Sequence, residues 1–177
     1  PFVISNAITS GTLMSLNISA SDIGELVLPK GWRFDEYDGV YYGPDGEEQE
    51  EPPEGLKPEG VMALADGVKN SETIMTVNVM ANGIGKEQLS KLQEMMQAHR
   101  TLVSLCGIAD DATVANLSGL GMDPDDAVVL ADELPVKGAL TSLNVSNNAL
   151  CGLAKYGRGT YDVSGVTALA DAIGKHQ

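Results

Sequence analysis

The side chains that most often do chemistry in proteins are few in this chain of 177 residues. It has two cysteines, Cys106 and Cys151, and two histidines, His99 and His176, with no CxxC pair and no histidine spaced to complete a metal-ligand set. GxSxG, HExxH, P-loop and GxGxxG patterns are also absent from the sequence. We therefore expect a protein that is not an enzyme, with no catalytic residues, no metal and no cofactor. The cysteines are expected to be reduced and buried, as in an intracellular protein.

Carboxylates are abundant, but their pattern does not predict a metal site. The chain has 25 Asp plus Glu against 11 Lys plus Arg, a formal net charge of -14. Asp35, Asp38 and Asp45 could form a weak calcium site, yet their spacing departs from the EF-hand loop. A solvated acidic surface is the preferred interpretation. This charge repels the phosphate backbone of nucleic acid and favours a neutral or basic protein partner.

The elements that must position any site are indicated by an internal repeat. Residues 140–150 read LxxLxVxxNxL, and weaker copies lie at residues 13–23, 74–84 and 115–122. The core of this block alternates with the period of two that a short strand needs. A second block, with apolar residues at the spacing of one helical stripe, recurs at residues 61–68, 127–134 and 166–173. Each repeat is therefore predicted to be a strand, a turn and a helix, with an undisturbed period of 28 residues from Leu117 to Val145.

These blocks resemble the ribonuclease-inhibitor-like subfamily of leucine-rich repeats over nearly the whole chain. The resemblance implies an α/β fold: a right-handed solenoid, or horseshoe, with a concave parallel β-sheet and convex helices. We expect one domain over residues 1–177, with about four repeats and a partial N-terminal helix that holds Val3, Ile4 and Ala7. In such repeats the asparagine after the strand satisfies backbone groups, so Asn82 and Asn148 are expected to be structural.

Three stretches exceed the repeat and are predicted to be inserted loops, at about residues 24–57, 105–114 and 151–164. Seven of the eight aromatic residues fall in the first and third of these loops: Trp32, Phe34, Tyr37, Tyr41, Tyr42, Tyr156 and Tyr161. Aromatic side chains on loops above a rigid scaffold favour partner binding. The preferred alternative for Trp32 and Phe34 is a small core of their own, in a hairpin that turns at Asp38 and Gly39. The Pro and Gly content of residues 44–60 argues against regular structure there.

The concave face is predicted to carry a row of asparagines, because the positions beside the central leucine of each strand point away from the core. These residues are Asn17, Asn78, Asn116 and Asn144. Small polar residues flank them, namely Ser15, Thr76 and Ser142 on one side and Ser19, Ser118 and Ser146 on the other. Stacked amides could simply bond to one another along the sheet. The row could instead offer donors and acceptors to a peptide or another polar ligand.

The predicted function is protein or peptide binding on the concave face and the loop rim. The candidate contact residues are Asn17, Asn78, Asn116, Asn144, Ser15, Ser142, Trp32, Tyr41, Tyr42 and Tyr156. No run of 18 apolar residues could span a membrane, so we expect a cytoplasmic protein.

Two alternatives to this function stay open. One is a structural module of a longer repeat array, with end-to-end association and with Val3, Ile4, Leu169 and Ile173 exposed or covered by another chain, because neither end shows a polar capping repeat. The other is a regulator similar to the Ran GTPase-activating proteins, which share generic repeats of this kind and end in acidic sequence.

Overall fold

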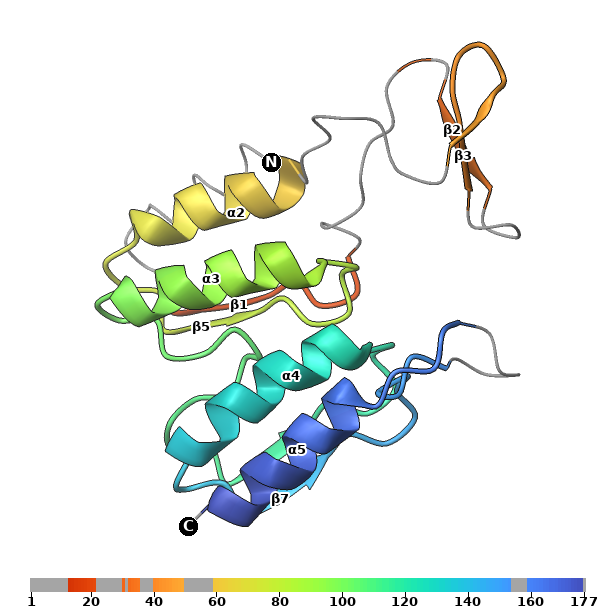
Figure 1. Cartoon of the computed structure of the whole chain (residues 1–177). Coiled ribbons are helices and arrows are strands. Elements are labelled where there is room, and N and C mark those ends of the chain that lie inside the picture. The colour runs from red at the N-terminus through yellow and green to blue at the C-terminus, as the bar shows by residue number, and fades with distance from the viewer. Residues whose placement is uncertain are drawn as a thin grey trace.

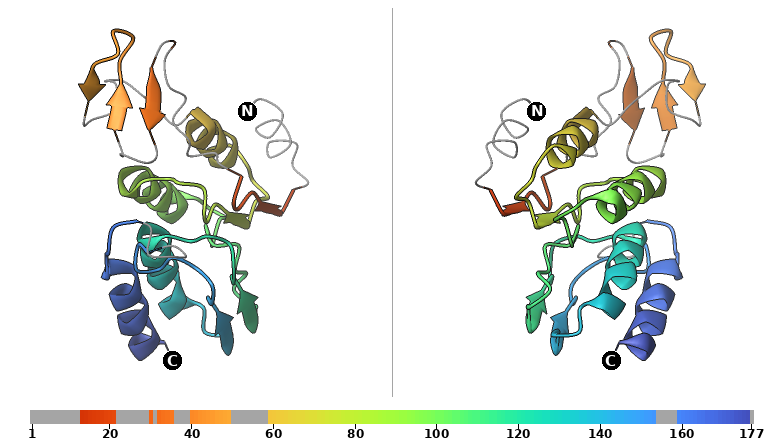
Figure 2. Two further views of the ribbon diagram at one scale, coloured as in Figure 1. Left: turned by 90° about the vertical axis from the view of Figure 1, so that its right-hand side faces the viewer. Right: turned by 90° about the vertical axis from the view of Figure 1, so that its left-hand side faces the viewer.

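A computed structural model of the chain describes residues 13–21, 30, 32–35, 40–49, 59–153 and 159–176, and short strands alternate there with helices (Figure 1). The strands are β1 (Ser15–Asn17), β2 (Arg33–Asp35), β3 (Val40–Tyr42), β4 (Glu48–Gln49), β5 (Thr76–Asn78), β6 (Val114–Asn116) and β7 (Ser142–Asn144). The helices are α2 (Glu59–Lys69), α3 (Lys86–Ala98), α4 (Pro124–Glu133) and α5 (Ser164–Lys175), with a short 3-10 helix η1 (Leu134–Val136) after α4. Helices α2 to α5 lie on one side of the molecule, and β1, β5, β6 and β7 lie on the other (Figure 2). None of the described helices is long and apolar enough to cross a membrane.

Each helix buries a stripe that contains one equivalent leucine. Leu64, Leu92, Leu130 and Leu169 retain 4%, 2%, 0% and 6% of their surface and belong to one hydrophobic core. Apolar residues at helical spacing produce such a stripe. The start of α4 is fixed locally as well, because Asp123 and Asp126 form a reciprocal capping box on either side of Pro124, the first residue of the helix.

The strands pair in parallel in the register that the repeat predicts. In β1 and β5, Leu16 lies opposite Val77, and in β6 and β7, Ala115 lies opposite Leu143. These are two separate two-stranded sheets, and Figure 2 shows that the pairs run in different directions. The single concave sheet of a horseshoe therefore stays a prediction.

The predicted loop at about residues 105–114 contains no helix, but each of its ends takes part in strand pairing. Ser104 forms a parallel bridge with Thr76, 28 residues earlier, and Cys106 bridges to Asn78. Backbone hydrogen bonds from Val77 to Ser104 and from Val79 to Leu105, both 2.9 Å, continue this pairing on the free edge of β5. Val114 at the other end belongs to β6. The extra residues in this stretch are therefore a further strand segment, around Ser104, which leads directly into β6 with no helix between them.

Asn82 and Asn148 have the structural role that the sequence predicts. The side-chain amide of Asn148 donates to the carbonyls of Leu117 and Val145, at 2.8 and 3.0 Å, and its oxygen accepts from the N–H groups of Gly121 and Met122. Asn82 makes the equivalent bonds to Ile18, Val79 and Ser21. Each asparagine thus ties its own turn to the turn of the preceding strand.

The first inserted loop contains a small antiparallel sheet of β2, β3 and β4. The register places Arg33 opposite Tyr42 and Asp35 opposite Val40, so the predicted hairpin is confirmed, while its turn at residues 38–39 lies outside the described residues. The Arg33 guanidinium stacks 3.8 Å from the centre of the Tyr42 ring. The expectation of no regular structure after Pro44 is wrong at β4, which pairs with β3, and the third predicted loop is too long by one residue, because Ser164 begins α5.

We predict that Asn148→Ala lowers the free energy of unfolding by about 2–4 kcal/mol, because it leaves two carbonyls and two N–H groups without their partner. Urea unfolding followed by circular dichroism measures this change. Ser146→Ala in the same turn is the control, because the backbone N–H of the exposed Ser146 bonds to Asn144 and survives the substitution. Equal effects of the two substitutions would contradict the role of Asn148.

Candidate functional site

The predicted row of asparagines is interrupted at its second member. Asn17, Asn116 and Asn144 are exposed, but Asn78 retains only 7% of its surface and Thr76 only 5%. The cause is the strand segment around Ser104, which pairs beside β5, and Gly107 lies so close to Asn78 that an added Cβ would meet the Asn78 side chain at 2.9 Å. The prediction that Asn78 contributes to an open groove is therefore wrong.

The four asparagines share one local hydrogen bond. The side-chain oxygen of each accepts from the backbone N–H two residues later: Asn17 from Ser19, Asn78 from Met80, Asn116 from Ser118 and Asn144 from Ser146, at 3.0 to 3.2 Å. This is an Asx turn, which fixes the orientation of the amide at the end of each strand. Among the described residues, no bond between stacked asparagine amides is present. The paired registers still align Asn17 with Asn78 and Asn116 with Asn144.

The surface of β6 and β7 is the largest stretch of this row that solvent can reach. We call it the polar strand face, and it consists of Val114, Asn116, Ser118, Ser142, Asn144 and Ser146. Val114, 64% exposed, lies opposite Ser142, and Asn116 lies opposite Asn144. At the other end of the chain, the hydroxyl of Ser15 accepts a 2.8 Å hydrogen bond from the buried Thr76 hydroxyl. One hydrogen-bonding position of Ser15 is therefore used within the fold.

The predicted aromatic contacts do not share this surface. Trp32, Tyr41 and Tyr42 are half-buried in the small antiparallel sheet, which lies at the opposite end of the molecule from β6 and β7 (Figures 1 and 2). Tyr156 falls outside the described residues. The one highly exposed aromatic side chain described is Tyr161, at 67%, just before α5. The polar strand face and the hairpin therefore do not form one binding site.

Sequence reasoning missed a group of buried charges between the two strand pairs. Glu133 of α4 is 3% exposed and accepts two 2.6 Å hydrogen bonds, from the Ser104 hydroxyl and the Leu105 N–H. Lys137, 1% exposed, donates to the Val103 carbonyl and to Asp110 at 2.9 and 2.8 Å. Side chains of α4 and its exit thus bind the backbone of the helix-free strand segment.

Asp126 extends these contacts at the start of α4. Its carboxylate accepts from the N–H of Ala81, in the turn after β5, at 3.0 Å, and from the N–H of Asp123 at 3.1 Å. Burial, and then the neighbouring Asp123 carboxylate, raise the pKa of Asp126 to about 6. Burial also raises the pKa of Glu133, against the opposing hydrogen bond from Ser104.

A signal for this group exists in the repeat. Asp126 and Glu133 of α4 have small residues as their counterparts when the helices are aligned on their central leucines. The counterparts are Gly60 and Gly67 in α2, and Gly165 and Ala172 in α5. Small residues let a neighbouring helix approach, and an added Cβ at Gly165 would meet the Ala127 Cβ of α4 at 2.8 Å. Carboxylates at the same positions indicate that no helix precedes α4 at this spacing.

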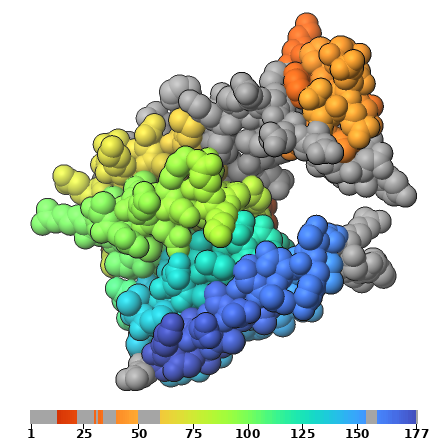
Figure 3. Space-filling view, viewed as in Figure 1, coloured from red at the N-terminus to blue at the C-terminus, as the bar shows by residue number. Residues whose placement is uncertain are grey.

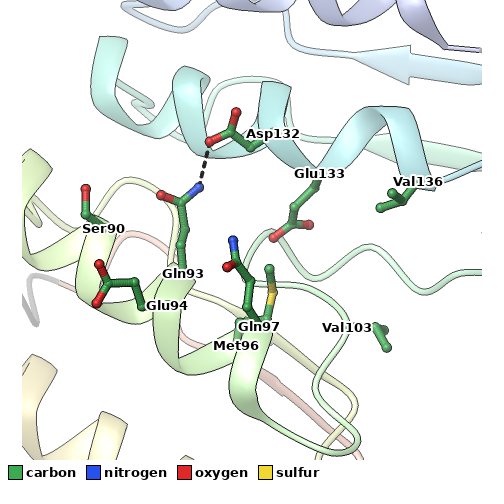
Figure 4. Close-up of a pocket in the computed structure, with 9 residues that line it drawn as sticks. All are labelled: Ser90, Gln93, Glu94, Met96, Gln97, Val103, Asp132, Glu133 and Val136. Atoms are coloured by element: carbon green, nitrogen blue, oxygen red, sulfur yellow. Dashed lines mark hydrogen bonds between the residues drawn. The ribbon is translucent and has the colours of Figure 1, made fainter.

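The missing helix leaves a groove of about 600 Å³ between α3 and α4. Figure 4 shows Gln93 of α3 reaching Asp132 of α4 across it, with a 2.9 Å hydrogen bond. Polar residues such as Ser90, Glu94, Gln97 and Glu133 line it together with Met96, Val103 and Val136, and apolar atoms form the larger part of its surface. The groove is explained by the architecture, since the strand at Ser104 brings no helix to fill it.

The two cysteines differ in their surroundings. Cys106 is buried as predicted, and burial, followed by the Glu133 carboxylate, raises the pKa of its thiol well above the usual value. Cys151 is only half-buried, which corrects the prediction for that residue. In the part of the chain that the structure describes, no three His, Cys, Asp or Glu residues lie close enough to hold a metal ion.

Comparisons with protein-family models, with curated proteins and with solved structures found no match for this chain.

We predict that Glu133→Gln lowers the free energy of unfolding by about 1–3 kcal/mol. Ser104 Oγ already accepts from the N–H groups of Cys106 and Ile108, so its hydroxyl must donate to residue 133, as Leu105 N–H does. A glutamine amide has one acceptor oxygen, so its NH2 group would face a donor. Denaturant unfolding provides the measurement, with Asp132→Asn as the exposed neighbouring control. A loss no larger than that of Asp132→Asn would refute this account of Glu133.

We predict that Asp126→Asn removes a pH dependence of stability. Because the folded-state pKa is raised from 3.8 to about 6, the native state binds the extra proton, and wild-type stability falls as pH rises from about 4 to 6. The loss amounts to about 3 kcal/mol at most, and the asparagine variant lacks it. Unfolding curves between pH 3.5 and 7.5 measure this effect. The stability of the variant should rise relative to that of the wild type between about pH 4 and 6, and the difference in unfolding free energy should then stay constant.

The same series needs Asp126→Ala, which removes the acceptor for Ala81 and Asp123 as well as the charge. It should be less stable than Asp126→Asn at every pH. If the difference in unfolding free energy between the wild type and Asp126→Asn does not change from pH 4 to 6, the raised pKa of Asp126 would be refuted.

Proposed function

We propose that this chain is a non-catalytic binding module, built like a leucine-rich-repeat scaffold, whose polar strand face holds an extended segment of a protein or peptide. The observation that carries the proposal is the pair of exposed, aligned asparagines Asn116 and Asn144. Neighbouring strands in a sheet are separated by about 4.8 Å, so their side chains present a regular row.

The asparagine amides are preorganised for this role. The oxygens of Asn116 and Asn144 are held by the N–H groups of Ser118 and Ser146, and no described residue accepts from either side-chain nitrogen. Two oriented NH2 groups at strand spacing can donate to carbonyl oxygens of a bound backbone. Fixed donors lose little entropy on binding, which favours affinity.

The rest of the face supports a partner without strong negative charge. Val114 adds an exposed apolar contact beside Ser142, and the face itself carries no ionisable side chain. The whole chain has a formal net charge of -14, so its field attracts basic segments and repels acidic ones, while a neutral segment pays no such penalty. The half-buried aromatics of the small antiparallel sheet are left out of this site, because they lie at the other end of the molecule.

We predict that peptides selected from a phage-displayed random library on the full chain lose at least about tenfold in affinity for Ser142→Arg. The arginine would stand at one end of the face, opposite Val114 and two residues before Asn144, without disturbing an Asx turn. Thr167→Arg on the exposed side of α5 is the matched control and should bind the peptides like the wild type. Selected peptides are expected to be neutral or basic.

Two outcomes would count against the proposal. Selections that give no peptide sensitive to Ser142→Arg would show that the polar strand face does not bind extended segments. Peptides equally weakened by Thr167→Arg would place binding on the helical side.

A further inference from the structure

The outer side of α5 carries an apolar stripe that solvent reaches. Ile173 is 63% exposed, Val166 is 47% exposed, and Ala170 between them is exposed too. These residues occupy i, i+4 and i+7, so they lie on one side of the helix. Figure 3 shows α5 at the lower edge of the helix layer, with α4 along one flank and no described element along the other.

Helix α2 is a close internal standard for this stripe. Its sequence EGVMALADGVK matches SGVTALADAIGK of α5, with Val61, Ala65 and Val68 at the positions of Val166, Ala170 and Ile173. In α2 the two valines retain only 3% and 1% of their surface. Ala65 lies with Met95, Ala98 and His99 of α3 at a shared pocket, and His99 bonds to the Val68 carbonyl. In α2, the stripe is covered by the next helix along the chain.

The same three positions in α4 follow the same rule. Ala127, Ala131 and Leu134 retain 0%, 5% and 2% of their surface, and Gly165 of α5 lies against Ala127. The next helix, α5, again covers the stripe.

Helix α3 is an intermediate case. The distance from strand to helix is the same in this repeat as in the repeat of α4, so the equivalent residues of α3 are Leu89, Gln93 and Met96. Leu89 is 2% exposed, whereas Gln93 and Met96 line the groove between α3 and α4, because no helix follows at the strand of Ser104. Helix α5 alone among the described helices combines an apolar stripe with exposure.

The strand side of this last repeat is also uncovered. β7 pairs with β6 on one edge only, and no described strand lies on its other edge. An unpaired edge beside an uncovered apolar helix is what one unit presents to the next in a stacked array. Tyr161 and Val163, just before α5, are also exposed, at 67% and 48%.

We infer that the stripe of Val166, Ala170 and Ile173, together with the free edge of β7, is the docking surface for one more strand–turn–helix unit of the same design. The helix of that unit lies beside α5 as α5 lies beside α4, with glycine or alanine at the positions of Gly165 and Ala172. This inference concerns the helical side and the end of the array, so it does not depend on binding at the polar strand face.

The test supplies the unit directly, by extending the full chain after residue 177 with a second copy of residues 139–177. Aligning the central leucines places residue 177 at the position of Gly138, which keeps the copy in register with the α4-to-β7 connection. In the original chain, Ile173→Lys should change the Tm by less than about 2 °C, since the side chain is exposed. In the extended chain, the same substitution should lower the Tm by about 5 °C or more, because the lysine would be buried.

The appended copy contains its own control, because its isoleucine equivalent to Ile173 is exposed at the new end and its replacement by lysine should be mild. Equal effects of Ile173→Lys in both chains would overturn the inference. Light scattering on the original chain gives the second readout: a dimer that Ile173→Lys dissociates would mean that a second copy, not a further unit, occupies the face, and the inference would be wrong.

Discussion

The arrangement of this protein depends on the hydrogen bonds that the backbone of one strand segment, around Ser104, makes at the place where the repeat lacks a helix. The segment around Ser104 pairs with β5 and then turns directly into β6, so no helix covers it. Its buried N–H and C=O groups are bonded by Glu133 and Lys137 from the far side, and Asp126 does the same for Ala81. Burying these charges is costly unless each is fully hydrogen-bonded, which makes the contacts both geometrically demanding and essential.

This junction explains the shape of the molecule. Two strand pairs, each backed by helices, meet at a connection where Leu102 and Leu105 pack in the core and charged side chains bond to backbone groups. The pairs consequently run in different directions, and the groove between α3 and α4 opens on the helical side (Figures 2 and 4). The same segment buries Asn78 and Thr76, which divides a polar row that the repeat alone would have made continuous.

The helix surfaces respond to the same break. In α2 and α4, where another helix follows, the outer stripe is valine, alanine or leucine, and in α3, where none follows at the strand of Ser104, Gln93 and Met96 of this stripe line the groove. The two binding surfaces that we propose are of different kinds. The polar strand face would offer oriented amides to an extended segment, and the outer side of α5 would offer an apolar stripe to a packed helix. Their chemistry differs because hydrogen-bond donors select a backbone, whereas apolar area selects a complementary shape.

The sequence by itself determined the local units: short strands at a spacing of 28 residues, the parallel register between paired strands, the leucine stripes, the bonds of Asn82 and Asn148, and the hairpin at Arg33 and Tyr42. These features follow from periodicity and turn chemistry, which act over a few residues. The helix-free strand at Ser104, the burial of Asn78, the partners of Glu133 and the separation of the aromatic hairpin from β6 and β7 were decided only by the tertiary structure. Each of them depends on which segments distant in sequence come to share an edge or a face, and a local pattern does not contain that information.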